Sequence, residues 1–167
     1  LAMGACYAGG YLTVQAESAN PDIQALLLLF STEDLGGVPH KFDGITINVA
    51  LMRPESRGFV KAKNANISEA PVIQPNYLEA KKDRDTLVAG MQEIRKIMRK
   101  PALQEIILSE YSPSSEVESN EQCLDFIRDR ARTSYHPVGT CKMGRDKMAV
   151  VDERLRVKKI SWSHLRF

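Results

Sequence analysis

Few residues in the chain could carry acid–base chemistry, because its 167 residues include only three histidines, His40, His136 and His164. His136 is followed by Pro137, in a segment rich in glycine and threonine that lacks amphipathic periodicity. An imidazole titrates near neutral pH, so a histidine in an irregular segment can act as a general base. The alternative is a histidine that only hydrogen-bonds its own loop, and the spacing leaves both interpretations open.

Cys141 lies five residues after His136 and raises two other kinds of site. The pair could supply two zinc ligands, but a structural zinc site needs four, and no second close pair lies nearby. A Cys–His nucleophilic pair would need an orienting geometry that cannot be read from the spacing. We therefore expect Cys141 to be a small buried apolar residue, and we expect no metal site.

Nucleotide-binding and hydrolase motifs are missing from the sequence. Neither GxGxxG nor GxxxxGK[ST] occurs, and the nucleophile motif GxSxG is absent as well. Glycine-rich loops of the first two kinds hold phosphates with backbone N–H groups. The chain therefore has no phosphate-binding loop of its own, and no motif supports a serine- or cysteine-dependent hydrolase.

Composition restricts the class of protein further. The 23 basic and 21 acidic residues give a net charge of +2, which argues against a nucleic-acid binder that works through a basic surface. Hydrophobic residues make up 43%, enough for a buried core and too many for a disordered chain. The clearest apolar run, 25–30, is far shorter than the ~18 residues of a membrane-spanning helix. Three scattered cysteines exclude a disulfide scaffold and fit a reducing compartment.

The strands that must support His136 are predicted from periodicity and turn residues. Alternating residues over 45–52 are typical of a strand with one β-branched face. The leucine-rich run 23–30 predicts a strand buried on both faces. Further short strands are expected at 11–14, 59–62, 150–152 and 155–157.

The first predicted helix begins at Asp83 or Asp85, either of which could cap it, and it is ended by Pro101. Its apolar residues recur at helical spacing and are Leu87, Met91, Ile94 and Met98.

A second helix begins at Ser119 or Asn120 and ends near Arg132, with Ser119 and Gln122 at capping-box spacing. Strands precede helices along the chain and do not alternate with them. We therefore predict an α+β fold, in which helices cover a mixed or antiparallel sheet.

The segment around His136 resembles a known protein family. Residues 134–144 read Ser-Tyr-His-Pro-Val-Gly-Thr-Cys-Lys-Met-Gly, and Val-Val-Asp at 150–152 and Leu-Arg-Val at 155–157 follow. This series closely resembles the C-terminal part of the glucose–methanol–choline (GMC) oxidoreductases. The HPVGTCKMG stretch is most similar to the choline and aliphatic alcohol dehydrogenase branch of that family.

Other motifs occur in the same order as in that family and extend the resemblance over almost the whole chain. Residues 53–58 resemble its RPxSRG turn, and residues 75–78 resemble its PxxxNYL stretch. Residues 83–102 resemble its DxxxLxxGxxxxR…PA helix. The resemblance implies that these motifs form the scaffold around the substrate.

The resemblance implies a role for His136. In the family, the histidine of the HP-x-GT motif faces the flavin and the alcohol, and takes the hydroxyl proton while the carbinol hydride passes to flavin N5. A neutral imidazole suits this step, because removing the O–H proton raises the hydride-donating power of the alkoxide. The resemblance also places Tyr135 and Pro137 close to the substrate pocket.

The resemblance also sets expectations for the domains. Residues 1–157 correspond to the substrate-binding domain, and residues 158–167 to a divergent or truncated tail. The chain begins at Leu1 and has no GxGxxG, so we expect a fragment without the FAD Rossmann domain, with FAD bound mostly by the missing N-terminal part. His164 in the tail does not match the family's second active-site residue, and it is assigned no role.

Together, these features predict part of an FAD-dependent alcohol or choline dehydrogenase. The alternative is a solitary, non-catalytic binding module that keeps the scaffold, because the dinucleotide motif and the family's last segment are both absent. We expect a small-molecule alcohol substrate, no nucleic-acid partner, no transmembrane segment and a cytoplasmic location, with membrane association left open for the full-length enzyme. The particular alcohol, the electron acceptor and the oligomeric state stay open.

Overall fold

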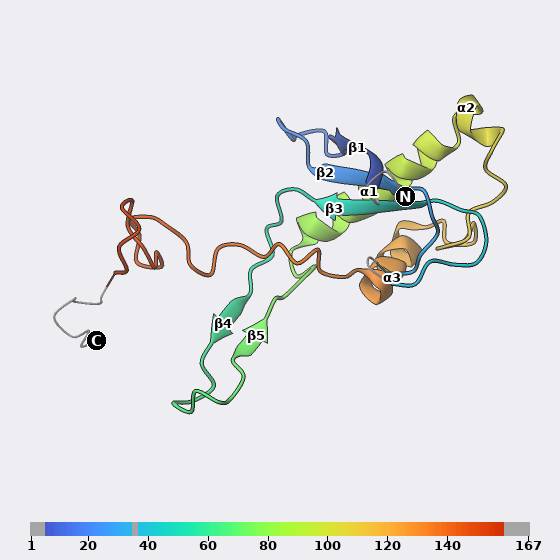
Figure 1. Cartoon of the computed structure of the whole chain (residues 1–167). Helices are drawn as coiled ribbons and strands as arrows, with labels where there is room; N and C mark the ends of the chain where they lie inside the picture. Colours follow the sequence, from blue (N-terminus) through green and yellow to red (C-terminus); the bar gives the residue numbers. More distant parts are fainter. Residues whose placement is uncertain (1–5, 35–36, 159–167) are drawn as a thin grey trace. The chain divides into compact units, whose positions relative to one another are not determined.

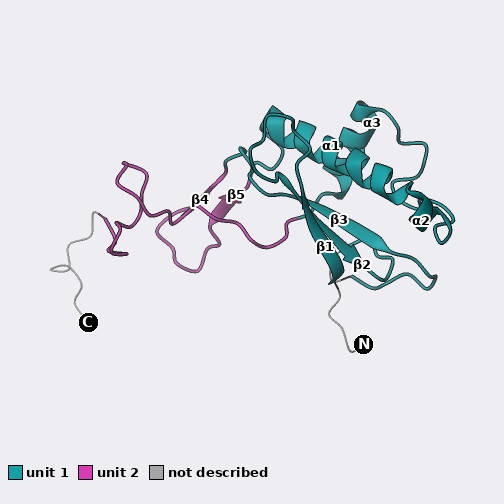
Figure 2. Cartoon of the chain, turned by 90° about the horizontal axis from the view of Figure 1, so that it is seen from above, with its two compact units in different colours: residues 1–57, 76–132 teal, residues 58–75, 133–167 magenta. Residues whose placement is uncertain are grey.

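The computed structural model describes residues 6–34 and 37–158. They form two units, shown in different colours in Figure 2. Unit 1 combines the chain up to Arg57 with Asn76–Arg132, and unit 2 combines Gly58–Pro75 with the chain from Thr133 onward. His164 lies outside the described residues, as does nearly all of the predicted tail.

Unit 1 contains a three-stranded antiparallel sheet. β1 (Cys6–Leu12), β2 (Ile23–Leu28) and β3 (Thr46–Leu51) follow the order β1-β2-β3, so β2 is central (Figure 1). β2 ends two residues before the leucine-rich run does, and Leu29 beyond it is exposed. The prediction that both faces of this run are buried is therefore wrong at its C-terminal end.

One face of the sheet packs against the long helix α1 (Lys81–Met98). A Cβ atom at Gly90 would lie 3.0 Å from a side-chain carbon of Ile23 and 3.0 Å from one of Val49. These two residues come from neighbouring strands and share a face of the sheet. Glycine at this position therefore lets the helix approach the sheet closely, because a larger side chain would press on both neighbours.

Helix α3 (Asn120–Arg130) packs on α1 and completes a small apolar core. Val88 from α1 is buried there together with Cys123 and Ile127 from α3. Along the chain, the short helix α2 (Pro101–Gln104) comes between α1 and α3. Helices that pack on each other and on an antiparallel sheet confirm the predicted α+β class.

The helix starts agree with the sequence in one case and differ in the other. The Ser119 hydroxyl accepts the Gln122 N–H at 3.1 Å, and the Gln122 side chain accepts the Ser119 N–H at 3.0 Å, which confirms the predicted capping box of α3. Helix α1 instead begins after Ala80, which makes no side-chain cap. The prediction that Asp83 or Asp85 caps α1 is therefore wrong, because both lie inside the helix.

Unit 2 contains a short antiparallel pair and an irregular segment. β4 (Phe59–Lys61) pairs with β5 (Val72–Gln74). In the segment 133–158, the strands predicted at 150–152 and 155–157 are reduced to isolated bridges that join Val151 to Met143 and to Val157.

Candidate active site

His136 lies in the irregular segment that follows α3, as the sequence predicts. Residues 131–140 contain neither helix nor strand, and the side chains of Tyr135, His136 and Pro137 are exposed. In the described part of the chain, no hydrogen bond or ion pair involves the His136 imidazole.

The backbone around His136 has an unusual conformation. Tyr135 has φ of 60°, in the left-handed region, and its N–H donates to the Thr133 Oγ1 at 3.0 Å. Pro137 follows His136, and a residue before proline is held in extended backbone. Gly139 then has φ of 102°. His136 is thus flanked by one residue with a left-handed backbone conformation and by a proline.

The chain after His136 is organised by its own hydrogen bonds over residues 142–158. The N–H of Val150 donates to the Lys142 carbonyl at 2.9 Å, and that of Gly144 donates to the Val151 carbonyl at 3.1 Å. The Asp152 carboxylate accepts the N–H of Arg154 at 2.9 Å and the Arg156 guanidinium at 2.8 Å. The Arg156 guanidinium holds the pKa of the Asp152 carboxyl below its ordinary value.

Cys141 is exposed, so the expectation of a buried apolar residue is wrong. The family-like segment around it forms no strand or helix that could cover the thiol. Within residues 6–34 and 37–158, no group of three or more histidine, cysteine, aspartate or glutamate side chains is placed to hold a metal ion.

The RPxSRG-like turn of unit 1 is anchored to helix α1 by a buried carboxylate. Asp83 accepts the N–H of Glu55 and the N–H of Ser56, both at 2.8 Å, and the Ser56 hydroxyl at 2.5 Å. The Ser56 Oγ in turn accepts the N–H of Ala80, at the start of α1, at 3.0 Å. Two of the motifs found in the sequence are therefore joined in space, although they lie 27 residues apart.

The surroundings of the Asp83 carboxyl favour its charged form. Burial alone would raise the pKa of its carboxyl, but hydrogen bonds from Glu55 and Ser56 outweigh this effect, with a smaller contribution from the charge of Arg57. The pKa therefore lies below its ordinary value. The carboxylate is a structural anchor, since its oxygens already accept three donors.

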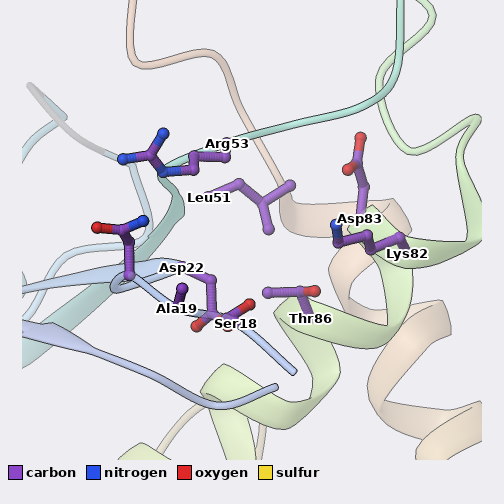
Figure 3. A pocket seen from close by; sticks show the side chains of 9 residues that line it. Ser18, Ala19, Asp22, Leu51, Arg53, Lys82, Asp83 and Thr86 are labelled. Atoms are coloured by element: carbon purple, nitrogen blue, oxygen red, sulfur yellow. The ribbon is translucent and has the colours of Figure 1, made fainter. Parts of the chain in front are cut away.

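A cavity of about 100 Å³ adjoins this anchor, between the β1–β2 connection, the end of β3 and the first turns of α1 (Figure 3). Its lining includes the basic residues Arg53 and Lys82 and the buried acids Asp22 and Asp83. Asp22 already accepts two backbone N–H groups of the β1–β2 connection, at 2.9 and 3.0 Å. Such a volume holds only a few water molecules. We therefore interpret the cavity as a small gap where these segments meet, and not as a binding site.

His40 is the other described histidine, and it lies between β2 and β3. Its Nδ1 is 2.8 Å from the Ser31 Oγ, its Nε2 is 3.8 Å from the Glu33 carboxylate, and its ring stacks on Phe42. These are the residue types of a hydrolytic triad. Ser31 is buried, however, and a Cβ at Gly44 would lie 2.9 Å from the Ser31 Cβ. Because little room for a substrate remains at the hydroxyl, we assign this group to packing.

Sequence reasoning misses a second polar anchor, Arg95. Its guanidinium bonds the Glu110 carboxylate at 2.8 Å, the Val117 carbonyl at 2.5 Å and the Ser114 carbonyl at 3.0 Å. It thereby fastens the loop before α3 to α1. The available signal was its place in the DxxxLxxGxxxxR spacing, but that spacing does not identify its partners.

The described part of the chain contains no helix that is long and apolar enough to cross a membrane.

Known proteins match this chain in sequence. An oxygen-dependent choline dehydrogenase of Escherichia coli O127:H6 is 38% identical over 150 residues, which cover 90% of this chain and 27% of that protein. An alcohol dehydrogenase [acceptor] of Pseudomonas putida is 36% identical, again over 90% of this chain and 27% of that protein. The chain therefore spans about a quarter of the length of the curated relatives it matches.

Solved structures match the fold. The crystal structure of pyridoxine 4-oxidase from Mesorbium loti superposes with a TM-score of 0.73 at 25% identity, over 92% of this chain and 31% of that one. A formate oxidase from Aspergillus oryzae superposes with a TM-score of 0.71 at 22% identity, over 83% of this chain and 25% of that one, which shows likeness of fold alone. The sequence pattern of the family described as GMC oxidoreductase matches residues 54–162. This match includes the RPxSRG-like turn except for Arg53, the α1 motif and the His136 segment, and the chain belongs to the GMC oxidoreductase family.

Proposed function

We propose that this chain is the substrate-binding domain, residues 1–157, of an FAD-dependent oxidoreductase that oxidises the CH–OH group of choline or another small alcohol. The observation that carries the proposal is His136, an exposed imidazole within the family-matched region, set in the HPVGTCKMG sequence. The similarity to a choline dehydrogenase and an alcohol dehydrogenase supports this substrate class.

The side chains near His136 would suit contact with one end of FAD. The apolar side chains that flank the imidazole are open to contact: Tyr135 is 80% exposed and Val138 is 93% exposed. Exposed apolar groups beside an unpaired imidazole suit a flat ring system and a bound alcohol. The sequence lacks GxGxxG, so we expect the phosphates of FAD to be held by another part of the protein.

His136 would act as the general base. A neutral imidazole has one unprotonated ring nitrogen, which can take the hydroxyl proton of the alcohol. Bound FAD supplies the hydride acceptor. Transfer of the O–H proton to His136 would make the alcohol a better hydride donor to that acceptor, and this two-electron oxidation would give an aldehyde or ketone. Tyr135 and Pro137 would border the substrate and hold the imidazole in place.

Replacing His136 by alanine tests this role. In a chimaera where this chain replaces the matching 150-residue segment of the Escherichia coli choline dehydrogenase, we expect flavin reduction by choline to slow on the order of 10²–10⁴-fold. His40→Gln is the matched control, since His40 is packed in unit 1, and its flavin reduction rate should stay near that of the parent chimaera. An unchanged rate in the His136→Ala protein would reject the role of general base.

The alternative, a non-catalytic binding module, is supported by the absence of a dinucleotide motif from the sequence. The two functions differ in what the chain does in isolation and when joined to a flavin domain. We expect the purified chain neither to retain FAD on gel filtration nor to reduce a dye with choline. A chimaera that holds flavin and binds choline, yet never reduces the flavin, would favour the binding module.

A further inference from the structure

We propose that Thr133 is a positioning residue for His136, and this inference rests on the proposed function of His136 as a base. The Thr133 hydroxyl accepts the Tyr135 N–H at 3.0 Å, and so closes a turn just before the histidine. Tyr135, the residue directly before His136, has a left-handed φ of 60° in this turn.

The direction of the His136 side chain depends on the backbone. The imidazole makes no hydrogen bond or ion pair within the described residues, and its position is exposed. Within the described residues, no polar partner is therefore available to aim it. What remains is the pair of dihedral restraints on either side, from Tyr135 and from Pro137.

The restraint from Pro137 is intrinsic to the sequence. The proline ring fixes its own φ near −65° and disfavours helical backbone at the preceding residue. His136 is thereby biased toward extended backbone. This restraint persists whatever happens upstream, so it does not decide between alternative directions of the Tyr135–His136 peptide.

The restraint from Tyr135 is not intrinsic. A left-handed φ is unfavourable for a residue with a Cβ, and Tyr lacks the short polar side chain that makes asparagine tolerant of it. The Tyr135 side chain is 80% exposed, so packing does little to offset this cost. The hydrogen bond from the Tyr135 N–H to the Thr133 hydroxyl opposes this cost.

Removing the Thr133 hydroxyl should therefore release the turn. With no acceptor for its N–H, Tyr135 would relax to negative φ, a rotation of the chain just before His136. Displacing a catalytic group by about 1 Å can cost on the order of 10²-fold in rate. Thr133→Val keeps the branched shape without the acceptor, and Thr133→Ser keeps the acceptor without the methyl group.

The first test measures the turn in the 167-residue chain itself. Using isotope-labelled protein, the φ-dependent coupling constant and the amide temperature coefficient of Tyr135 are recorded by NMR. We expect a left-handed φ and a hydrogen-bonded amide in the wild type and in Thr133→Ser, and a negative φ with a solvated amide in Thr133→Val. A negative φ in the wild type, or an unchanged Tyr135 in Thr133→Val, would overturn the proposal.

The second test measures the consequence in the choline dehydrogenase chimaera. We expect Thr133→Val to lower kcat about 10–100-fold, with KM for choline and the melting temperature nearly unchanged, and Thr133→Ser to retain the parent rate. The pH dependence of kcat/KM should keep its shape in Thr133→Val, since the base itself is intact. A normal kcat in Thr133→Val, or equal losses in both variants, contradicts a positioning role. If His136→Ala also keeps the parent rate, the proposed function fails first, whereas the NMR result still decides the turn.

Discussion

Replacing Asp83 by asparagine measures how strongly helix α1 holds the turn at residues 53–58. The carboxylate is 2% exposed and accepts two backbone N–H groups at 2.8 Å and the Ser56 hydroxyl at 2.5 Å. Asparagine keeps only one of the two oxygens, so its NH2 group would face a backbone N–H. At least one hydrogen bond to a charged acceptor is lost, worth about 1.5–3 kcal/mol, and the others become weaker neutral ones. We expect Asp83→Asn to lower the free energy of unfolding by about 3 kcal/mol.

Urea unfolding of the chain, followed by far-ultraviolet circular dichroism, measures this loss, because the signal reports on α1 and α3. Asp85→Asn is the matched control. Asp85 lies two residues further along the same helix, is exposed, and forms an ion pair with the exposed Lys81. An exposed pair of this kind contributes about 0–1 kcal/mol, so the control should unfold close to the wild type.

The pH dependence of the free energy of unfolding tests whether the charged form of Asp83 stabilises the fold. Folding lowers the pKa of Asp83, so its carboxylate stabilises the fold above the unfolded-state pKa of about 3.9. That contribution is lost as the pH falls through the lower, folded-state pKa, and the gap between the wild type and Asp83→Asn should narrow there. Equal losses in the two asparagine variants, or a gap that stays constant down to about pH 2, would refute the anchoring role.

Two further substitutions examine the scaffold. Gly90→Ala gains about 1 kcal/mol of helix propensity, but its methyl group presses on Ile23 and Val49, where overpacking costs about 1–3 kcal/mol. We expect a net loss of up to about 2 kcal/mol in the free energy of unfolding by urea. A more stable variant would contradict the close approach of helix and sheet. Ser119→Ala removes the capping box of α3 and should cost about 1 kcal/mol by the same assay. Ser119→Asp should restore most of this loss, and a failure to do so would show that the cap contributes little.

Local signals in the sequence predict most of the helices and strands. Alternation locates β3 to within a residue or two, and the Ser119–Gln122 spacing locates the start of α3. The cap of α1 is mispredicted because an aspartate near a helix start can serve either the helix or a distant partner. The donors to Asp83 lie 27 and 28 residues away, and no local pattern encodes such a distance.

The sequence predicts the irregular segment that contains the candidate site, but not the exposure and backbone conformation of the residues in it. Proline and glycine around His136 indicate an irregular segment, and the structure has one. Exposure of Cys141 is not predictable in this way, since burial depends on which elements cover a residue. The left-handed Tyr135 is likewise unexpected, because a tyrosine carries no intrinsic preference for that conformation.

The motif on α1 that resembles the family pattern is explained by structural contacts, without a role in catalysis. At 100° per residue, Asp83 and Gly90 lie within about 20° of each other around the helix, and Arg95 lies about 120° from Asp83. One side of α1 thus holds the turn and meets the sheet, and another side fastens the loop before α3. Each of the three residues has a different partner within unit 1, and none needs a ligand to explain its type. Substitutions at these positions should therefore act through stability, whereas the proposed function predicts that changes in the His136 segment alter the reaction itself.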